Sequence, residues 1–84
     1  MNIKKSTRKH KKYQTVYNGK TIHFGDDRYE DYTTHHDNKR KQSYLKRHGN
    51  KTDPAKPGFW AQNILWNKPT IQASIIATKT KLKI

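Results

Sequence analysis

The chain has 84 residues, and 19 lysines and arginines against 6 aspartates and glutamates give it a formal net charge of +13. Only 30% of the residues are hydrophobic, so this length allows one small domain with a modest core. The absence of cysteine excludes disulfides, a thiolate nucleophile and any cysteine-ligated zinc site.

The excess of positive charge predicts an anionic partner, because like charges repel one another. Nucleic acid is the first candidate, with DNA favoured over RNA, since phosphates form a dense row of charge and release counterions on binding. Acidic proteins are the alternative partner, and nothing in the sequence indicates a small-molecule substrate or a cofactor. No signal peptide is expected, because no apolar run follows the basic start MNIKKSTRKHKK. The most apolar stretch, 71–77, is too short to cross a bilayer.

Residues 1–12 contain no acid and only two apolar side chains, which predicts a disordered basic arm. Its cations are predicted nucleic-acid-binding residues: Lys4, Lys5, Arg8, Lys9, Lys11 and Lys12. A terminus that contacts nothing specific is the alternative for this segment.

A β-hairpin is predicted over residues 13–24, because Asn18-Gly19 is typical of a type I′ turn. The turn sets a register that pairs Tyr17 with Lys20, Thr15 with Ile22, and Tyr13 with Phe24. One face then carries Tyr13, Tyr17, Ile22 and Phe24, which we expect to pack on helices rather than stack on bases.

Two helices are expected next. Gly25-Asp26-Asp27 is predicted to end the hairpin and cap a helix over residues 28–34, with Tyr29 and Tyr32 on one face. A second helix is predicted over residues 38–48, begun by Asp37 and closed by Gly49. Its cations point away from a stripe of Tyr44, Leu45 and His48. They complete the predicted nucleic-acid-binding set: Lys39, Arg40, Lys46 and Arg47.

Two prolines and two glycines predict a loop over residues 49–58. The apolar block FWAQNILW (59–66) predicts a short helix, whose Phe59, Trp60 and Trp66 belong either to the core or to a protein interface. Thr70 is expected to cap a last helix over about 71–80, and residues 81–84 to form a flexible tail. The fold class is therefore α+β: a two-stranded hairpin packed on three or four short helices, forming one domain over residues 13–80.

No catalytic or metal site is predicted, and the chain is not expected to be an enzyme. His35, His36 and Asp37, with His23 or His48, offer ligand types but not a zinc-like spacing. The sequence has no glycine-rich phosphate loop and no serine beside a recognisable base.

Two blocks, FGDDRYEDYTTHHDNKRKQSYLKRH (24–48) and GFWAQNILWNKPTI (58–71), resemble a known family over roughly residues 12–76. It is a family of short, basic, uncharacterised proteins of large DNA viruses of algae and protists. The resemblance rests on Phe24-Gly25, Tyr29, Asp31-Tyr32, His35, Asp37, Arg40, Tyr44, Arg47-His48, Gly58-Phe59-Trp60 and Leu65 to Pro69. The loop between the blocks is shorter than the family pattern, and no enzyme motif accompanies it.

The resemblance implies a viral setting, in the virion or in the cytoplasm or nucleus of a host cell. Two functions are then open. The first is a non-enzymatic protein that binds nucleic acid through the phosphate backbone. The alternative is a minor structural protein, a cement or core component, that binds other virion proteins through its tryptophan block.

Overall fold

The computed structural model describes residues 2–49 and 51–83. Residue 1 of the predicted arm, residue 50 of the predicted loop and residue 84 of the predicted tail lie outside the described part. Three strands, β1 (Lys4–Lys5), β2 (Lys11–Tyr17) and β3 (Lys20–Asp26), form an antiparallel sheet in that order. The helices that follow are α1 (Tyr32–His35), α2 (Asn38–His48), α3 (Pro57–Trp60), the π-helical turn η1 (Ala61–Leu65) and α4 (Ile71–Leu82). The α+β class is confirmed.

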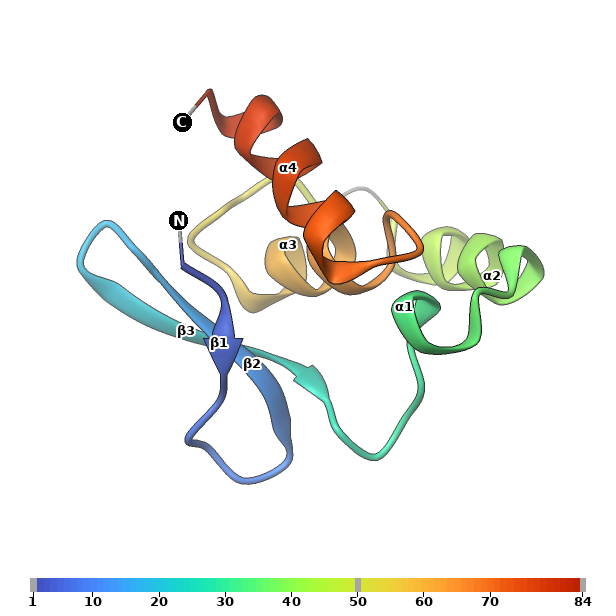
Figure 1. Cartoon of the computed structure of the whole chain (residues 1–84), viewed down its shortest axis with the longest axis horizontal. Helices are drawn as coiled ribbons and strands as arrows, with labels where there is room; N and C mark the ends of the chain where they lie inside the picture. The colour runs from blue at the N-terminus through green and yellow to red at the C-terminus, as the bar shows by residue number, and fades with distance from the viewer. Residues whose placement is uncertain (1, 50, 84) are drawn as a thin grey trace.

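Figure 1 shows how these elements are arranged. The sheet lies at one end of the molecule, α3 and α4 lie beside it, and α1 and α2 extend to the opposite end. No helix of the described residues is long and apolar enough to cross a membrane.

The hairpin has the predicted register. Asn18 and Gly19 have φ values of 50° and 75°, as a type I′ turn requires. Tyr13 pairs with Phe24 and Thr15 pairs with Ile22. The side chains of Ile22 and Phe24 are buried, so the expectation that this face belongs to the core is confirmed.

The prediction of only two strands was wrong, because β1 pairs with β2 through Lys4↔Gln14 and Lys5↔Tyr13. Strand pairing uses the backbone, so both lysine side chains remain exposed while their peptide groups extend the sheet. Ile3 packs against the core, and the Thr7 amide donates to Gln14 Oε1 over 2.9 Å. The ordered domain therefore includes much of the expected arm, and α4 continues past residue 80.

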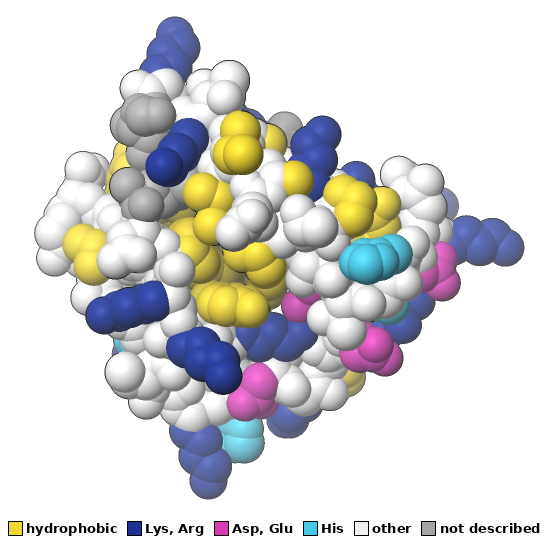
Figure 2. Space-filling model, viewed as in Figure 1, with side chains coloured by type: hydrophobic (Ala, Val, Ile, Leu, Met, Phe, Trp, Pro, Cys, Tyr) yellow, Lys and Arg dark blue, Asp and Glu magenta, His cyan; other side chains and the backbone are white. Residues whose placement is uncertain are grey.

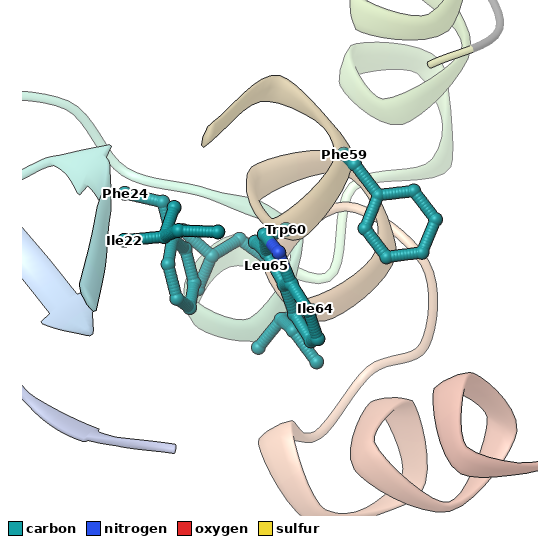
Figure 3. Packing of buried hydrophobic residues seen from close by; sticks show 6 residues of the cluster. All are labelled: Ile22, Phe24, Phe59, Trp60, Ile64 and Leu65. Atoms are coloured by element: carbon teal, nitrogen blue, oxygen red, sulfur yellow. The ribbon is translucent and has the colours of Figure 1, made fainter. Parts of the chain in front are cut away.

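The core lies between β3 and the helical block of α3 and η1 (Figure 3). Phe59 and Trp60 are 2% and 1% exposed, and the Trp60 indole Nε1 donates to the Pro54 carbonyl over 2.7 Å. These two side chains are therefore core residues and are not available as anchors for a protein partner. In Figure 3, Phe24 points from the strand toward Trp60, whereas Phe59 lies on the other side of the helix.

Residues 59–66 do not form one regular α-helix as predicted. The chain widens after Trp60 into η1, in which the four consecutive residues 62–65 are all buried. A regular amphipathic helix presents one face to a core, whereas η1 contacts β3 and α3 as well as α4. Thr70 caps α4 as predicted, accepting from the Ala73 amide over 3.1 Å. Ser74 and Thr78 are the residues that α4 buries.

The helix predicted over residues 28–34 begins later. Asp26 accepts from the Arg28 amide and from its guanidinium, so it forms a turn instead of a cap. Asp31 caps α1 by accepting from the Thr33 amide over 3.0 Å. Residues 27–30 are therefore a loop, and Tyr29 lies outside the helix with 68% of its surface exposed.

Candidate nucleic-acid interface

Local signals in the sequence define α2 at both ends. Asp37 Oδ1 accepts from the Lys39 and Arg40 amides over 2.9 and 3.3 Å. At the other end, Gly49 has a φ of 67° and donates its amide to the Leu45 carbonyl. Its φ is positive as predicted, although its ψ of −165° departs from the left-handed helical region. The predicted bounds of this helix are confirmed.

The four cations predicted on α2 lie on one face of it. At about 100° per residue, Lys46, Lys39, Arg47 and Arg40 fall within an arc of about 120°. All four are exposed. Within residues 2–49 and 51–83, no hydrogen bond or ion pair involves any of these four side chains. We call these four residues the α2 basic face.

The neighbouring side of α2, which carries Lys41 and Tyr44, attaches the helix to the rest of the molecule. The Tyr44 ring stacks on the Trp66 ring, with centroids 4.2 Å apart and planes 2° from parallel. Burial of Tyr44 raises the pKa of its hydroxyl. Lys41 Nζ donates to the Asn67 carbonyl over 2.6 Å and lies 4.8 Å from the centre of the Tyr32 ring. Trp66, predicted as core or interface, thus anchors α2 within the chain.

A groove of about 830 Å³ runs along α2. The wall on the α2 side carries Lys39, Arg40, Ser43, Tyr44, Arg47 and His48. The rest of the lining comes from α3, η1 and Trp66, which we call the floor, and from the end of β3 and residues 29–31, which we call the second wall. Arg40, Ser43, Tyr44 and Arg47 are spaced by three and four residues, so one face of the helix lines the groove.

Gly25 allows the sheet to approach the floor of the groove closely. It has a φ of 82°, and a Cβ at this position would lie 2.6 Å from Leu65 Cδ1 and 3.3 Å from Lys12 Cβ. Another residue here would meet both a strained backbone and a steric clash. Gly25 therefore sets how near the end of β3 lies to η1.

Two carboxylates in the groove are already paired with cations. The Arg28 guanidinium donates to Asp26 and, with the Arg28 amide, holds the pKa of that carboxyl well below its usual range. The same contact raises the pKa of Arg28. Lys12 Nζ lies 2.5 Å from Oδ2 of the buried Asp31. Glu30 is the third acid in the groove and is exposed.

The structure brings together only half of the ten predicted nucleic-acid-binding residues. The groove gathers Lys11, Lys12, Lys39, Arg40 and Arg47. Lys12 is occupied by Asp31, which leaves it unsuited to bind phosphate. A smaller hollow of about 340 Å³ shares Lys11 and Lys12 with the groove and adds Lys5.

The remaining predicted cations lie elsewhere on the surface. Lys46 is not among the residues that line the groove, and Lys4, Arg8 and Lys9 lie on β1 and the loop after it, on the sheet side of the molecule in Figure 1. Figure 2 shows Lys and Arg side chains spread around the rim of one face, with apolar side chains gathered in its middle. The positive charge is therefore distributed over several sides of the molecule.

The histidines have structural contacts in place of metal-site geometry. His23 Nδ1 lies 2.7 Å from Ser6 Oγ, His36 Nε2 lies 3.1 Å from the Thr33 carbonyl, and His35 Nδ1 accepts from the Asp37 amide. The part of the chain that the structure describes contains no group of three or more metal-ligating side chains.

Sequence reasoning missed the part of the groove that lies outside α2. Tyr29 and Glu30 were placed in a helix, although the structure puts both on the groove wall. The spacing of Arg40, Ser43, Tyr44 and Arg47 is the signal that identifies the α2 wall. No local signal places the end of β3 opposite it, because that approach depends on the contact between Gly25 and Leu65.

Comparison with known proteins gives a match to a family model. A family model described as a family of unknown function (DUF5754) matches residues 1–48, which is more than half of the chain. The chain therefore belongs to the DUF5754 family. No curated protein and no solved structure matches it.

Proposed function

We propose that this protein is a non-enzymatic nucleic-acid-binding protein that contacts the phosphate backbone through the α2 basic face. The proposal is supported by the arrangement and exposure of four cations: Lys39, Arg40, Lys46 and Arg47. They share one helical face, are exposed, and show no partner among the described residues. The helix that carries them buries no residue of its own.

Electrostatics favours this function over a purely solubilising role for the charge. Cations crowded on one face repel one another, and a row of phosphates relieves that repulsion while releasing counterions. Lys4, Lys5, Arg8 and Lys9 provide further exposed charge on β1 and the loop after it. Backbone contacts of this kind carry little sequence information, so binding should depend weakly on sequence.

The test is a titration of labelled duplex DNA at about 50 and about 200 mM salt, a range over which several phosphate contacts cost orders of magnitude in affinity. A variant with Lys39, Arg40, Lys46 and Arg47 all changed to Gln should bind more weakly. Its salt slope should be flatter by up to about 3.6, at about 0.9 per lost phosphate contact. Competition with unlabelled RNA then compares the affinities for the two polyanions, and we expect DNA to bind more tightly.

A matched control separates the effect of the α2 basic face on affinity from the effect of net charge. Changing the exposed Lys20, Lys56, Lys68 and Lys79 to Gln also lowers the net charge by four, from +13 to +9. The control should keep most of the affinity. Equal losses in both variants would show that charge alone matters, and unchanged affinity in the α2 variant would exclude this face. Failure of the wild-type protein to bind DNA at the lower salt would overturn the proposal.

The setting of this activity is part of the proposal. The sequence resemblance described above supports a viral protein that acts on a genome in the virion or in the host cell. The alternative, a structural protein that binds virion proteins through its tryptophan block, has less support. Phe59 and Trp60 are buried, and Trp66 is stacked on Tyr44, so these three side chains are occupied within the chain.

A further inference from the structure

The groove beside α2 has two unlike walls, and this difference indicates what it can hold. The α2 wall carries Arg40 and Arg47, which are two helical turns apart and about 10.5 Å from each other along the helix axis. The second wall carries Tyr29 and Glu30. The floor between them contains the apolar Pro57, Ala61 and Leu65. One side thus suits phosphate, and the middle suits a flat apolar surface.

The size of the groove restricts the ligand. A volume of about 830 Å³ falls within the range of about 300–1,000 Å³ that is usual for small-molecule pockets. Such a space holds about one or two nucleotides. A duplex is too wide to enter it and would contact the protein from outside the groove. The exposed carboxylate of Glu30, in the same groove as the arginines, also disfavours a second row of phosphates, which a duplex would bring.

Tyr29 is the feature that the rest of the structure leaves unexplained. Its side chain is 68% exposed at the wall of the groove, although an aromatic side chain normally gains stability from burial. The Arg28 guanidinium, itself held by Asp26, lies 5.8 Å from the centre of the ring. The ring therefore borders the groove without joining the core, which is the arrangement of a stacking platform for a base.

We propose that this groove binds a single-stranded segment of nucleic acid, with phosphates on Arg40 and Arg47 and a base stacked on Tyr29. This inference rests on the proposed function and narrows it. Duplex DNA contacts the α2 basic face from outside the groove, whereas a single strand also enters the groove and reaches Tyr29. The protein therefore prefers single-stranded to double-stranded nucleic acid of the same sequence.

The experiment compares Tyr29→Ala with Tyr29→Phe, each titrated with a labelled 12-mer single strand of mixed sequence and with the matching duplex. Base–aromatic stacking is worth about 1–3 kcal/mol by alanine substitution, so Tyr29→Ala should bind the single strand about 5- to 150-fold more weakly. Tyr29→Phe should bind it like the wild type, because stacking needs the ring and not the hydroxyl. Neither variant should change affinity for the duplex. Tyr29 is exposed, so both variants are expected to keep the wild-type fold by circular dichroism.

Tryptophan fluorescence provides a second readout at the floor of the groove. Trp66 lines the groove, whereas Trp60 is 1% exposed in the core. The single strand should quench the emission of the wild type and should quench Trp66→Phe far less.

The outcomes separate this inference from the function on which it rests. If wild-type protein binds duplex and single strand equally, and Tyr29→Ala binds both like the wild type, the groove proposal is overturned while the proposed function stands. If the protein binds neither probe at low salt, both are overturned. Binding of the single strand alone, with loss in Tyr29→Ala, supports the groove and removes the α2 basic face as a duplex site.

Discussion

The two ends of this molecule are built in opposite ways. The sheet, α3, η1 and α4 enclose a core in which Phe24 and Ile64 are fully buried. The helices α1 and α2 contain partly buried residues but none that is fully buried. The contacts that join them to the core include the Tyr44–Trp66 stack, the His35–Trp66 ring contact and the Lys41–Asn67 hydrogen bond. A small basic chain can thus keep its charge on a helix that contributes little to its core.

The difference between the two ends of the molecule has an energetic consequence. Cations on a core helix would have to be desolvated or paired, which costs free energy. On α2 they remain in water, and the caps Asp37 and Gly49 hold the helix together locally. The core end should therefore determine global stability, and the α2 end should determine binding. Substitutions at the two ends should separate these properties.

The largest effect is expected from Trp60→Ala at the core end. The change removes a side chain that is 1% exposed together with the hydrogen bond from its indole to Pro54. Aromatic-to-alanine changes in a core cost about 3–5 kcal/mol, which is a large share of the total for a small domain. Urea unfolding followed by far-ultraviolet circular dichroism should show this loss. A loss below about 1 kcal/mol would mean that the core is not organised around this residue.

A smaller and more local effect is expected from Trp66→Ala at the junction of the two ends. The Tyr44–Trp66 stack is an aromatic pair of a kind worth about 0.5–1.5 kcal/mol beyond its buried area. Amide hydrogen exchange should accelerate across α2 and change much less in β2 and β3. Equal acceleration in the helix and the sheet would show that the molecule opens as one cooperative unit, and that the two ends do not differ in stability.

Asp37→Ala should weaken only α2. It removes the carboxylate that accepts from the Lys39 and Arg40 amides, and losing such a cap costs about 1 kcal/mol. Because no residue of α2 is fully buried, most of this cost should appear as fraying of its first turn, visible in amide exchange of residues 39–41. Asp37→Asn is the matched control, since asparagine caps nearly as well. A large fall in the melting temperature would show that α2 supports the core.

These regions also differ in how far the sequence predicts them. The hairpin and α2 follow from residues close together in the chain: Asn18-Gly19 sets the turn, and Asp37 and Gly49 set the helix ends. The strand β1 was missed because highly charged residues indicate disorder, whereas pairing with the free edge of β2 is a tertiary event. The start of α1 was missed because Asp26 and Asp31 are both plausible caps. Contacts with Arg28 and Lys12 decide between them.

The candidate site shows the same division. The α2 basic face can be predicted from helical spacing alone, and all four of its cations are exposed as expected. The groove cannot be predicted in this way, since it forms where Gly25 meets Leu65 and brings Tyr29 across from Arg40. The burial of Phe59 and Trp60 likewise depends on how α3 packs against the sheet, which composition does not reveal.

The smallest effect is expected from Asp26→Asn, at the hydrogen-bonded pair between Asp26 and Arg28 on the groove wall. The Arg28 guanidinium lowers the pKa of Asp26 in the folded chain below the ordinary value of about 3.9 that applies when unfolded. A lowered folded pKa adds stability above pH of about 3.9, and that stability is lost as the pH falls through the folded value. The two side chains are 66% and 36% exposed, so solvent and salt screen the pair strongly.

The melting temperature of Asp26→Asn should therefore lie slightly below that of the wild type at pH 7, and the difference should close as the solution is acidified. Asparagine can still accept from the Arg28 amide, so the comparison isolates the charge. Arg28→Gln should show the same small, pH-dependent difference, since it removes the other member of the pair. A deficit that stays constant into strong acid would instead point to the hydrogen-bonded turn. In that case the shape of the groove wall, and not its charge, would account for the role of Asp26.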